Sequence, residues 1–126
     1  MYRIELTGKC FKYDTEQTII LWYSSKCEYS SLNEFVTSCW KKQYRKENCV
    51  RQTVDEWFAD FHIESVPVET FLQKIHEYIS NLENVEIDIS SRYTNAICLI
   101  KEAWNEAIYA AENEYDYVCF LWYTTA

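Results

Sequence analysis

Apolar and polar residues alternate at the start of the chain. From Tyr2 to Thr7 the apolar side chains occupy every second position, which is the period of a half-buried β-strand. Polar residues fill positions 12–16, and a second, strongly apolar stretch runs from Thr18 to Ser24. Two short strands joined by a polar turn predict an antiparallel β-hairpin.

Three segments after this hairpin have the spacing of amphipathic helices. The motif Ser31-Leu-Asn-Glu34 is a capping box, and we expect a helix from there to about Lys46. The motif Thr53-Val-Asp-Glu56 is a second capping box and predicts a short helix. Pro67 suits the first turn of a third helix that reaches about Leu82.

The last third of the chain predicts two strands around a long helix. Apolar residues alternate with acids from Val85 to Ile89, which favours a strand. Thr94 can cap a helix from Ala96 to about Ala111, and the segment Tyr117–Thr125 is apolar on both faces of a final strand.

The predicted fold class is therefore α+β, with the order β-β-α-α-α-β-α-β in a single domain over residues 1–126. We expect a mostly antiparallel sheet of about four strands packed with about four helices. The residues expected in its core are Leu21, Phe35, Trp40, Trp57, Leu72, Ile87, Ile100, Trp104 and Phe120.

The amino-acid composition excludes several classes of protein. The chain has one glycine and one proline, whereas dinucleotide-binding and Walker-type phosphate loops need several glycines. No basic stretch followed by an apolar segment begins the chain, so we expect no export signal, no membrane span and a cytoplasmic protein. The six cysteines are then expected to be reduced.

The pattern of histidines and cysteines does not favour catalysis. There is no C-x-x-C motif, and His62 and His76 lack metal-ligand spacing, so we expect no metal and no cofactor. No family signature surrounds Cys27 or Cys49, and we predict no catalytic residue and no enzyme activity. A deep pocket holding His62 or cysteines would instead indicate an enzyme or a small-molecule binder.

Acidity and aromatic content point to a protein partner. The net charge is −8, which disfavours direct binding of nucleic acid. Spaced carboxylates can imitate phosphates in a basic groove, and tyrosine and tryptophan supply rigid anchors. The residues predicted to contact the partner are Asp55, Glu56, Asp60, Glu64 and Glu69, followed by a second group of Glu112, Glu114 and Asp116.

One short segment resembles a known family. Ile100-Lys101-x-Ala103-Trp104-x-x-Ala107 is similar to a helix in short proteins of phages and plasmids of Gram-positive bacteria, some of which are anti-CRISPR inhibitors. The similarity covers eight residues, and Ile108 stands where a lysine is usual. It implies an inhibitor of a bacterial defence nuclease and assigns no site residue.

Besides the enzyme or small-molecule binder, three alternatives stay open on the sequence. The acidic residues could serve only to keep an aromatic-rich domain soluble. An immunity protein that neutralises a nuclease toxin would use the same acidic and aromatic chemistry. A homodimer is a further alternative, because a strand that is apolar on both faces needs cover on each side.

Overall fold

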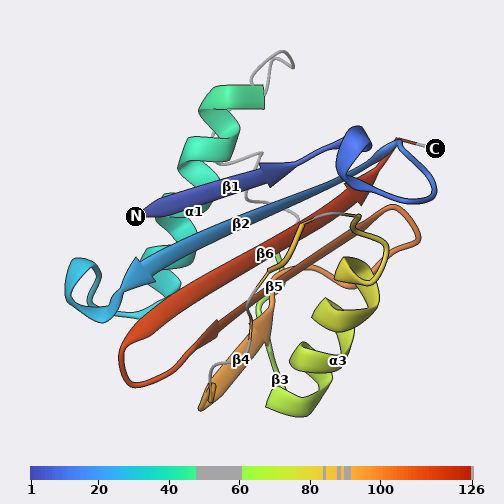
Figure 1. The fold of residues 1–126 in the computed structure, drawn as a ribbon. Helices are drawn as coiled ribbons and strands as arrows, with labels where there is room; N and C mark the ends of the chain where they lie inside the picture. The colour runs from blue at the N-terminus through green and yellow to red at the C-terminus, as the bar shows by residue number, and fades with distance from the viewer. Residues whose placement is uncertain (48–60, 84, 88, 90–91, 126) are drawn as a thin grey trace.

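The computed structural model describes residues 1–47, 61–83, 85–87, 89 and 92–125. Six strands form one antiparallel sheet in the order β1-β2-β6-β5-β4-β3 (Figure 1). Their bounds are β1 Tyr2–Leu6, β2 Gln17–Ser25, β3 Glu64–Val66, β4 Asn95–Cys98, β5 Glu106–Glu112 and β6 Asp116–Thr124.

Two α-helices within the described residues cover opposite faces of this sheet (Figure 1). Helix α1 spans Leu32–Glu47 and packs on β5 and β6, while α3 spans Val68–Ile79 and packs on β4 and β5. Single 3₁₀ turns lie at Gly8–Cys10 (η1) and Lys26–Glu28 (η2). No helix of the described ranges is long and apolar enough to cross a membrane.

Strands β2 and β6, which pair with each other in the interior of the sheet, are buried on both faces. Alternate residues of β2, such as Leu21 and Trp22, enter separate cores on the α3 side and the α1 side. In β6, Phe120 and Leu121 divide in the same way. Because successive strand side chains point to opposite faces, a continuous apolar run fits a strand with a helix on each side.

Several predicted elements are confirmed. The N-terminal hairpin is β1 and β2, the first helix is α1, and the helix after Pro67 is α3, which ends three residues before the expected Leu82. The final strand is β6. The second predicted helix, which begins at the Thr53 capping box, lies outside the described residues.

The predicted fold class is wrong in its balance of helices and strands. The expected helix from Ala96 to Ala111 is instead β4, a turn and β5. The apolar positions fit a helical period, but β5 is buried on both faces, and a short continuous apolar run cannot be assigned by period alone. Its alanines favour a helix in isolation, and pairing with β6 overrides that preference.

The predicted strand Val85–Ile89 is also wrong, since none of its described residues belongs to a strand of the sheet. Its alternation still reflects burial, because Val85, Ile87 and Ile89 all pack against the α3-side core. The alternation of apolar residues therefore correctly predicted which side chains contact the core. It wrongly predicted that the segment pairs as a strand of the sheet.

The predicted core needs one large correction. Trp104 is 74% exposed, because it lies in the turn before β5 and not on a buried helix face. Leu72, Ile87 and Ile100 are partly buried, and Trp57 lies outside the described residues. The remaining core predictions are buried: Leu21, Phe35, Trp40 and Phe120.

Candidate partner-binding surface

The hairpin between β5 and β6 carries two of the predicted acids at a well-ordered tip. The Asn113 side-chain oxygen accepts hydrogen bonds from the backbone N–H groups of Tyr115 and Asp116, each at 2.8 Å. The Asn113 N–H donates back to the Asp116 carbonyl at 3.0 Å. This turn holds Glu114, Tyr115 and Asp116 outward, and Tyr115 is 70% exposed.

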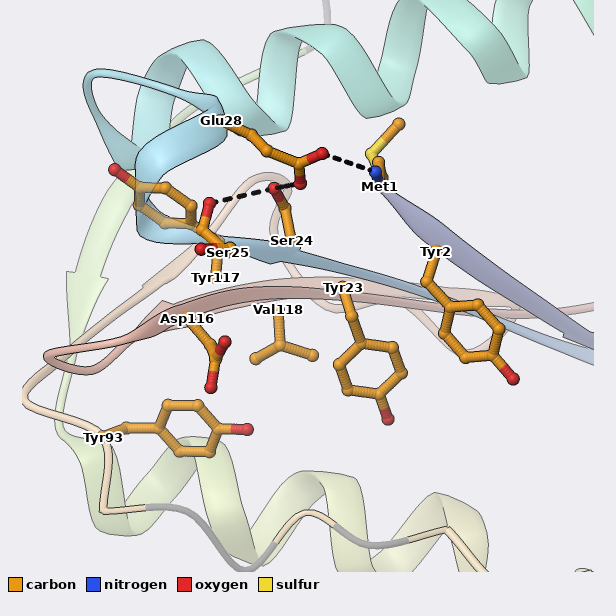
Figure 2. A pocket seen from close by; sticks show the side chains of 10 residues that line it. All are labelled: Met1, Tyr2, Tyr23, Ser24, Ser25, Glu28, Tyr93, Asp116, Tyr117 and Val118. Atoms are coloured by element: carbon orange, nitrogen blue, oxygen red, sulfur yellow. Dashed lines mark hydrogen bonds and ion pairs between the residues drawn. The ribbon is translucent and has the colours of Figure 1, made fainter.

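A pocket of about 430 Å³ lies beside this hairpin, at the end of β1, β2 and β6 (Figure 2). Pairing of Tyr23 with Val118, and of Ser25 with Asp116, joins β2 to β6 at this place. Tyr2 lies next to Tyr23 with ring centroids 6.2 Å apart. Figure 2 shows Tyr2, Tyr23, Val118, Asp116 and Tyr93 on one side of the strands.

The Glu28 carboxylate of this pocket is already occupied. It accepts a hydrogen bond from the Ser24 hydroxyl and pairs with the Met1 ammonium group at 2.9 Å. These two contacts, the Ser24 bond first, lower the pKa of Glu28. Glu28 therefore links η2 to the start of β1 and the end of β2, and the Met1 ammonium group balances its charge.

The Asp116 carboxylate is in the opposite situation. Its side chain is exposed and makes no hydrogen bond or ion pair with any of the described residues. It lies on the same side of the strands as Tyr23 and Tyr93 (Figure 2). An open carboxylate beside tyrosine rings suits a guanidinium or ammonium group, which the rings attract as well as the charge.

We call Glu114, Tyr115 and Asp116, together with Tyr2, Tyr23 and Tyr93, the hairpin surface. The third predicted acid of this region, Glu112, is neutralised, because Lys26 forms an ion pair with it. The same Lys26 ammonium lies 4.7 Å from the centre of the Tyr117 ring. The second group of predicted acids thus lies together at the hairpin, and two of its carboxylates, those of Glu114 and Asp116, are not bound by another side chain of the described residues.

The first group of predicted acids is not part of this surface. Glu64 lies on β3, at the opposite end of the strand order from β1, and its carboxylate is 3.8 Å from His62. Glu69 is exposed in the first turn of α3. Asp55, Glu56 and Asp60 lie outside the described residues.

The tyrosines of the hairpin surface were missed by sequence analysis. A signal existed for two of them, since Tyr2 and Tyr23 occupy facing positions of the predicted hairpin. Tyr93 stands in an irregular segment, where no period marks it as part of a site.

Apart from the neighbouring Cys39 and Cys119, the histidines and cysteines of the described residues lie in different parts of the structure, and Cys27 is a free, exposed thiol. No cluster of three or more histidine, cysteine or acidic side chains is found there. Burial raises the pKa of the Cys39 thiol, and the neighbouring Cys119 raises it further, which opposes thiolate formation. His62 and His76 are exposed, and neither histidine nor cysteine lines the pocket of Figure 2.

A partly buried network of hydrogen bonds around Glu102 links α3 to the segment before β5. The Glu102 carboxylate accepts hydrogen bonds from the Tyr109 hydroxyl at 2.6 Å and from the Lys74 ammonium at 3.2 Å. Partial burial acts against ionisation, but these bonds prevail and lower the pKa of Glu102. Burial and the Glu102 charge raise the pKa of Tyr109, so the hydroxyl stays a donor.

This network predicts an acid-sensitive contribution to stability. Because folding lowers the pKa of Glu102, its contribution is present above the ordinary value of about 4.5 and is lost as pH falls through the folded pKa. In Glu102→Gln, the melting temperature should fall less between about pH 5 and pH 3 than in the original protein. The same variant should lower the free energy of unfolding at pH 7 by about 1 kcal/mol. Thermal melts over that pH range measure both effects, and Glu114→Gln, at an exposed position in the hairpin turn, should keep the original curve. An unchanged pH dependence in Glu102→Gln would contradict the assignment.

No protein-family model, curated protein or solved structure matches this chain. The segment that resembles a phage-protein helix, residues 100–107, forms a turn and the first residues of β5. Function is therefore inferred from the hairpin surface and its chemistry.

Proposed function

We propose that this protein is a non-enzymatic inhibitor that blocks the basic, nucleic-acid-binding groove of a nuclease with its hairpin surface. The observation that carries the proposal is the open Asp116 carboxylate beside a pocket lined by Tyr2, Tyr23 and Tyr93. The partner class is a bacterial defence nuclease of the kind that anti-CRISPR proteins inhibit, and the proposed location is the cytoplasm where that nuclease acts.

The physical basis is the match between this surface and a groove that holds phosphates. Glu114 and Asp116 present two negative groups on a hairpin that Asn113 rigidifies. Tyr115 and Tyr2 add large contact area, being 70% and 63% exposed, and tyrosine loses little rotamer freedom when it binds. The net charge of −8 accelerates the approach to a cationic partner.

The experiment has two parts. The protein is immobilised and used to capture nucleases from a lysate of the cells that make it, and the captured nuclease is assayed for cleavage with and without added inhibitor. We expect inhibition, competition by the nuclease's own nucleic acid, and slower association as salt rises. Capture of a secreted toxin nuclease instead of a defence nuclease would identify an immunity protein.

Two charge-reversed variants locate the surface. Glu114→Lys with Asp116→Lys should weaken inhibition by about 100-fold, because reversed charges meet a cationic groove. Glu64→Lys with Glu69→Lys is the matched control, since it makes the same change in net charge at exposed positions on other elements. Equal losses in both variants would show a general charge effect and contradict the hairpin surface.

A third variant addresses the acids that the structure does not describe. Reversal of Asp55, Glu56 and Asp60 to lysine should leave inhibition near the wild-type level if the hairpin surface is the site. Loss of inhibition in that variant alone would move the site to the segment around residue 55.

A further inference from the structure

The pocket beside the β5–β6 hairpin holds one carboxylate whose charge no other group of the described residues balances. The Glu28 carboxylate pairs with the Met1 ammonium group at 2.9 Å. The Asp116 carboxylate, on the other side of the strands, makes no such pair with a described residue, not even with the exposed Arg92 next to Tyr93 in the chain (Figure 2). One ammonium group against two carboxylates leaves the pocket with an excess of one negative charge, which favours a ligand with one positive charge.

Strand pairing places this carboxylate beside an apolar side chain and an aromatic ring. Tyr23 pairs with Val118, and Asp116 lies two positions before Val118 on β6, so the three side chains leave the same face of the sheet. Figure 2 shows Val118 between the Asp116 carboxylate and the Tyr23 ring. Tyr93, from the segment before β4, adds a second ring to the same pocket. An acid, an apolar side chain and two aromatic rings thus line one cavity.

Neighbouring contacts hold these groups in place. Tyr93 packs edge-on against Phe71, with ring centroids 5.3 Å apart and the ring planes at 82°. The Tyr23 ring lies 6.2 Å from the Tyr2 ring. The backbone of Asp116 is fixed by the hydrogen-bonded turn of the hairpin. The pocket is therefore formed before a ligand arrives, which reduces the entropy lost on binding.

We propose that this pocket binds the side chain of a single arginine, supplied by the nuclease that the protein inhibits. The inference rests on the proposed function and names the group of the partner that the hairpin surface recognises. A carboxylate such as Asp116 can accept two parallel N–H bonds from a guanidinium, and the flat guanidinium stacks on aromatic faces such as those of Tyr23 and Tyr93. The pocket volume of about 430 Å³ lies in the range of small-ligand sites.

The same chemistry favours arginine over lysine. Both side chains carry one positive charge, but the lysine ammonium is more strongly hydrated and has no planar face to lay against a tyrosine ring. An arginine can therefore use the carboxylate and a ring at once, whereas a lysine uses mainly the charge.

The first test uses the protein alone with two probes, N-acetyl-arginine amide and N-acetyl-lysine amide. In a titration followed by amide-resolved NMR, the arginine probe should bind with a Kd of about 1–10 mM, the weak affinity expected of one side chain. The largest shifts should fall on Tyr23, Tyr93, Asp116 and Val118. The lysine probe should bind about fivefold more weakly. Equal or tighter binding of the lysine probe, or no shift at these residues with the arginine probe, overturns the proposal.

A matched pair of variants tests the role of the carboxylate. Asp116→Asn removes the charge and keeps the size of the side chain, so it should weaken binding of the arginine probe about tenfold. Glu16→Gln makes the same change in net charge at an exposed position next to the opposite end of β2, and it should leave the affinity unchanged. Equal weakening in both variants would show general attraction between charges and overturn the pocket.

A further variant tests the ring. Tyr93→Leu keeps an apolar contact with Phe71 and removes the aromatic face. It should weaken binding of the arginine probe about threefold and reduce the preference over the lysine probe. Thermal melting checks that the variant is folded, and Asp116→Asn decides the proposal should it not be. An unchanged preference in the folded variant contradicts stacking on Tyr93.

The nuclease assay separates this inference from the proposed function. Asp116→Asn should weaken inhibition about tenfold, in parallel with its loss of probe binding. Full inhibition by Asp116→Asn, with no binding of the arginine probe to the original protein, overturns the arginine pocket and leaves the inhibitor function in place. Binding of the arginine probe without inhibition of any captured nuclease overturns the proposed function and leaves the pocket in place.

Discussion

Replacing Trp22 with alanine is expected to lower the free energy of unfolding by about 3–5 kcal/mol. Trp22 is fully buried at the centre of β2, between the sheet and α1. Its ring lies 6.5 Å from that of Trp40, and the Arg3 guanidinium covers it. Removing it leaves a large cavity in the α1-side core, and cavities of that kind collapse only partly.

The matched control is Trp104, which is 74% exposed. Trp104→Ala should change the free energy of unfolding by less than about 0.5 kcal/mol, since most of its side chain is already in contact with solvent. Urea unfolding followed by far-ultraviolet circular dichroism measures both variants. Equal losses in the two variants would contradict the burial of Trp22 and the exposure of Trp104.

Gln17→Ala is expected to cost about 2–3 kcal/mol through loss of buried hydrogen bonds. The Gln17 side-chain oxygen accepts a bond from the Trp122 indole N–H at 2.8 Å. Its amide nitrogen donates to the backbone carbonyls of Tyr13 and Asp14, at 3.2 and 3.1 Å. Truncation leaves the indole N–H buried without an acceptor and releases the turn between β1 and β2, where Asp14 has a left-handed φ of 56°.

A double-mutant cycle isolates the indole bond. Trp122→Phe removes the N–H and keeps an aromatic ring against Tyr78, which stacks on Trp122 at 4.6 Å. The double variant should be less destabilised than the sum of the two single variants, by about 1 kcal/mol. Strict additivity in denaturant titrations would show that Gln17 and Trp122 act independently.

The local sequence pattern correctly predicted several elements of the fold. The predicted cap at Ser31 is present in the structure, where the Ser31 hydroxyl accepts from the Glu34 N–H at 3.1 Å. The Glu34 carboxylate reaches back one residue further than a capping box predicts and accepts from the Ser30 N–H, also at 3.1 Å. The period of α1 and the alternation of β1 are local properties of the chain, so neither needs knowledge of distant contacts.

The predicted helix over 96–111 failed for a different reason. Ala107, Ala110 and Ala111 are small residues that suit a helix, yet in β5 they line the middle of the sheet between bulky neighbours. Trp122 on β6 is the register partner of Ala107, and both residues belong to the α3-side core. A local pattern cannot contain that complementarity, because β-propensity depends on the cross-strand neighbours.

The candidate surface shows the same division. Acidity, aromatic content and the prediction that Glu112, Glu114 and Asp116 form one group came from the sequence, since the three lie within five positions. Only the pairing of β2 with β6, which brings Lys26 beside the β5–β6 hairpin, decided that Glu112 is bound by Lys26 while Asp116 is open. The charges and the spacing of apolar residues are local properties of the sequence. The partner of each carboxylate depends on which distant strands become neighbours in the sheet.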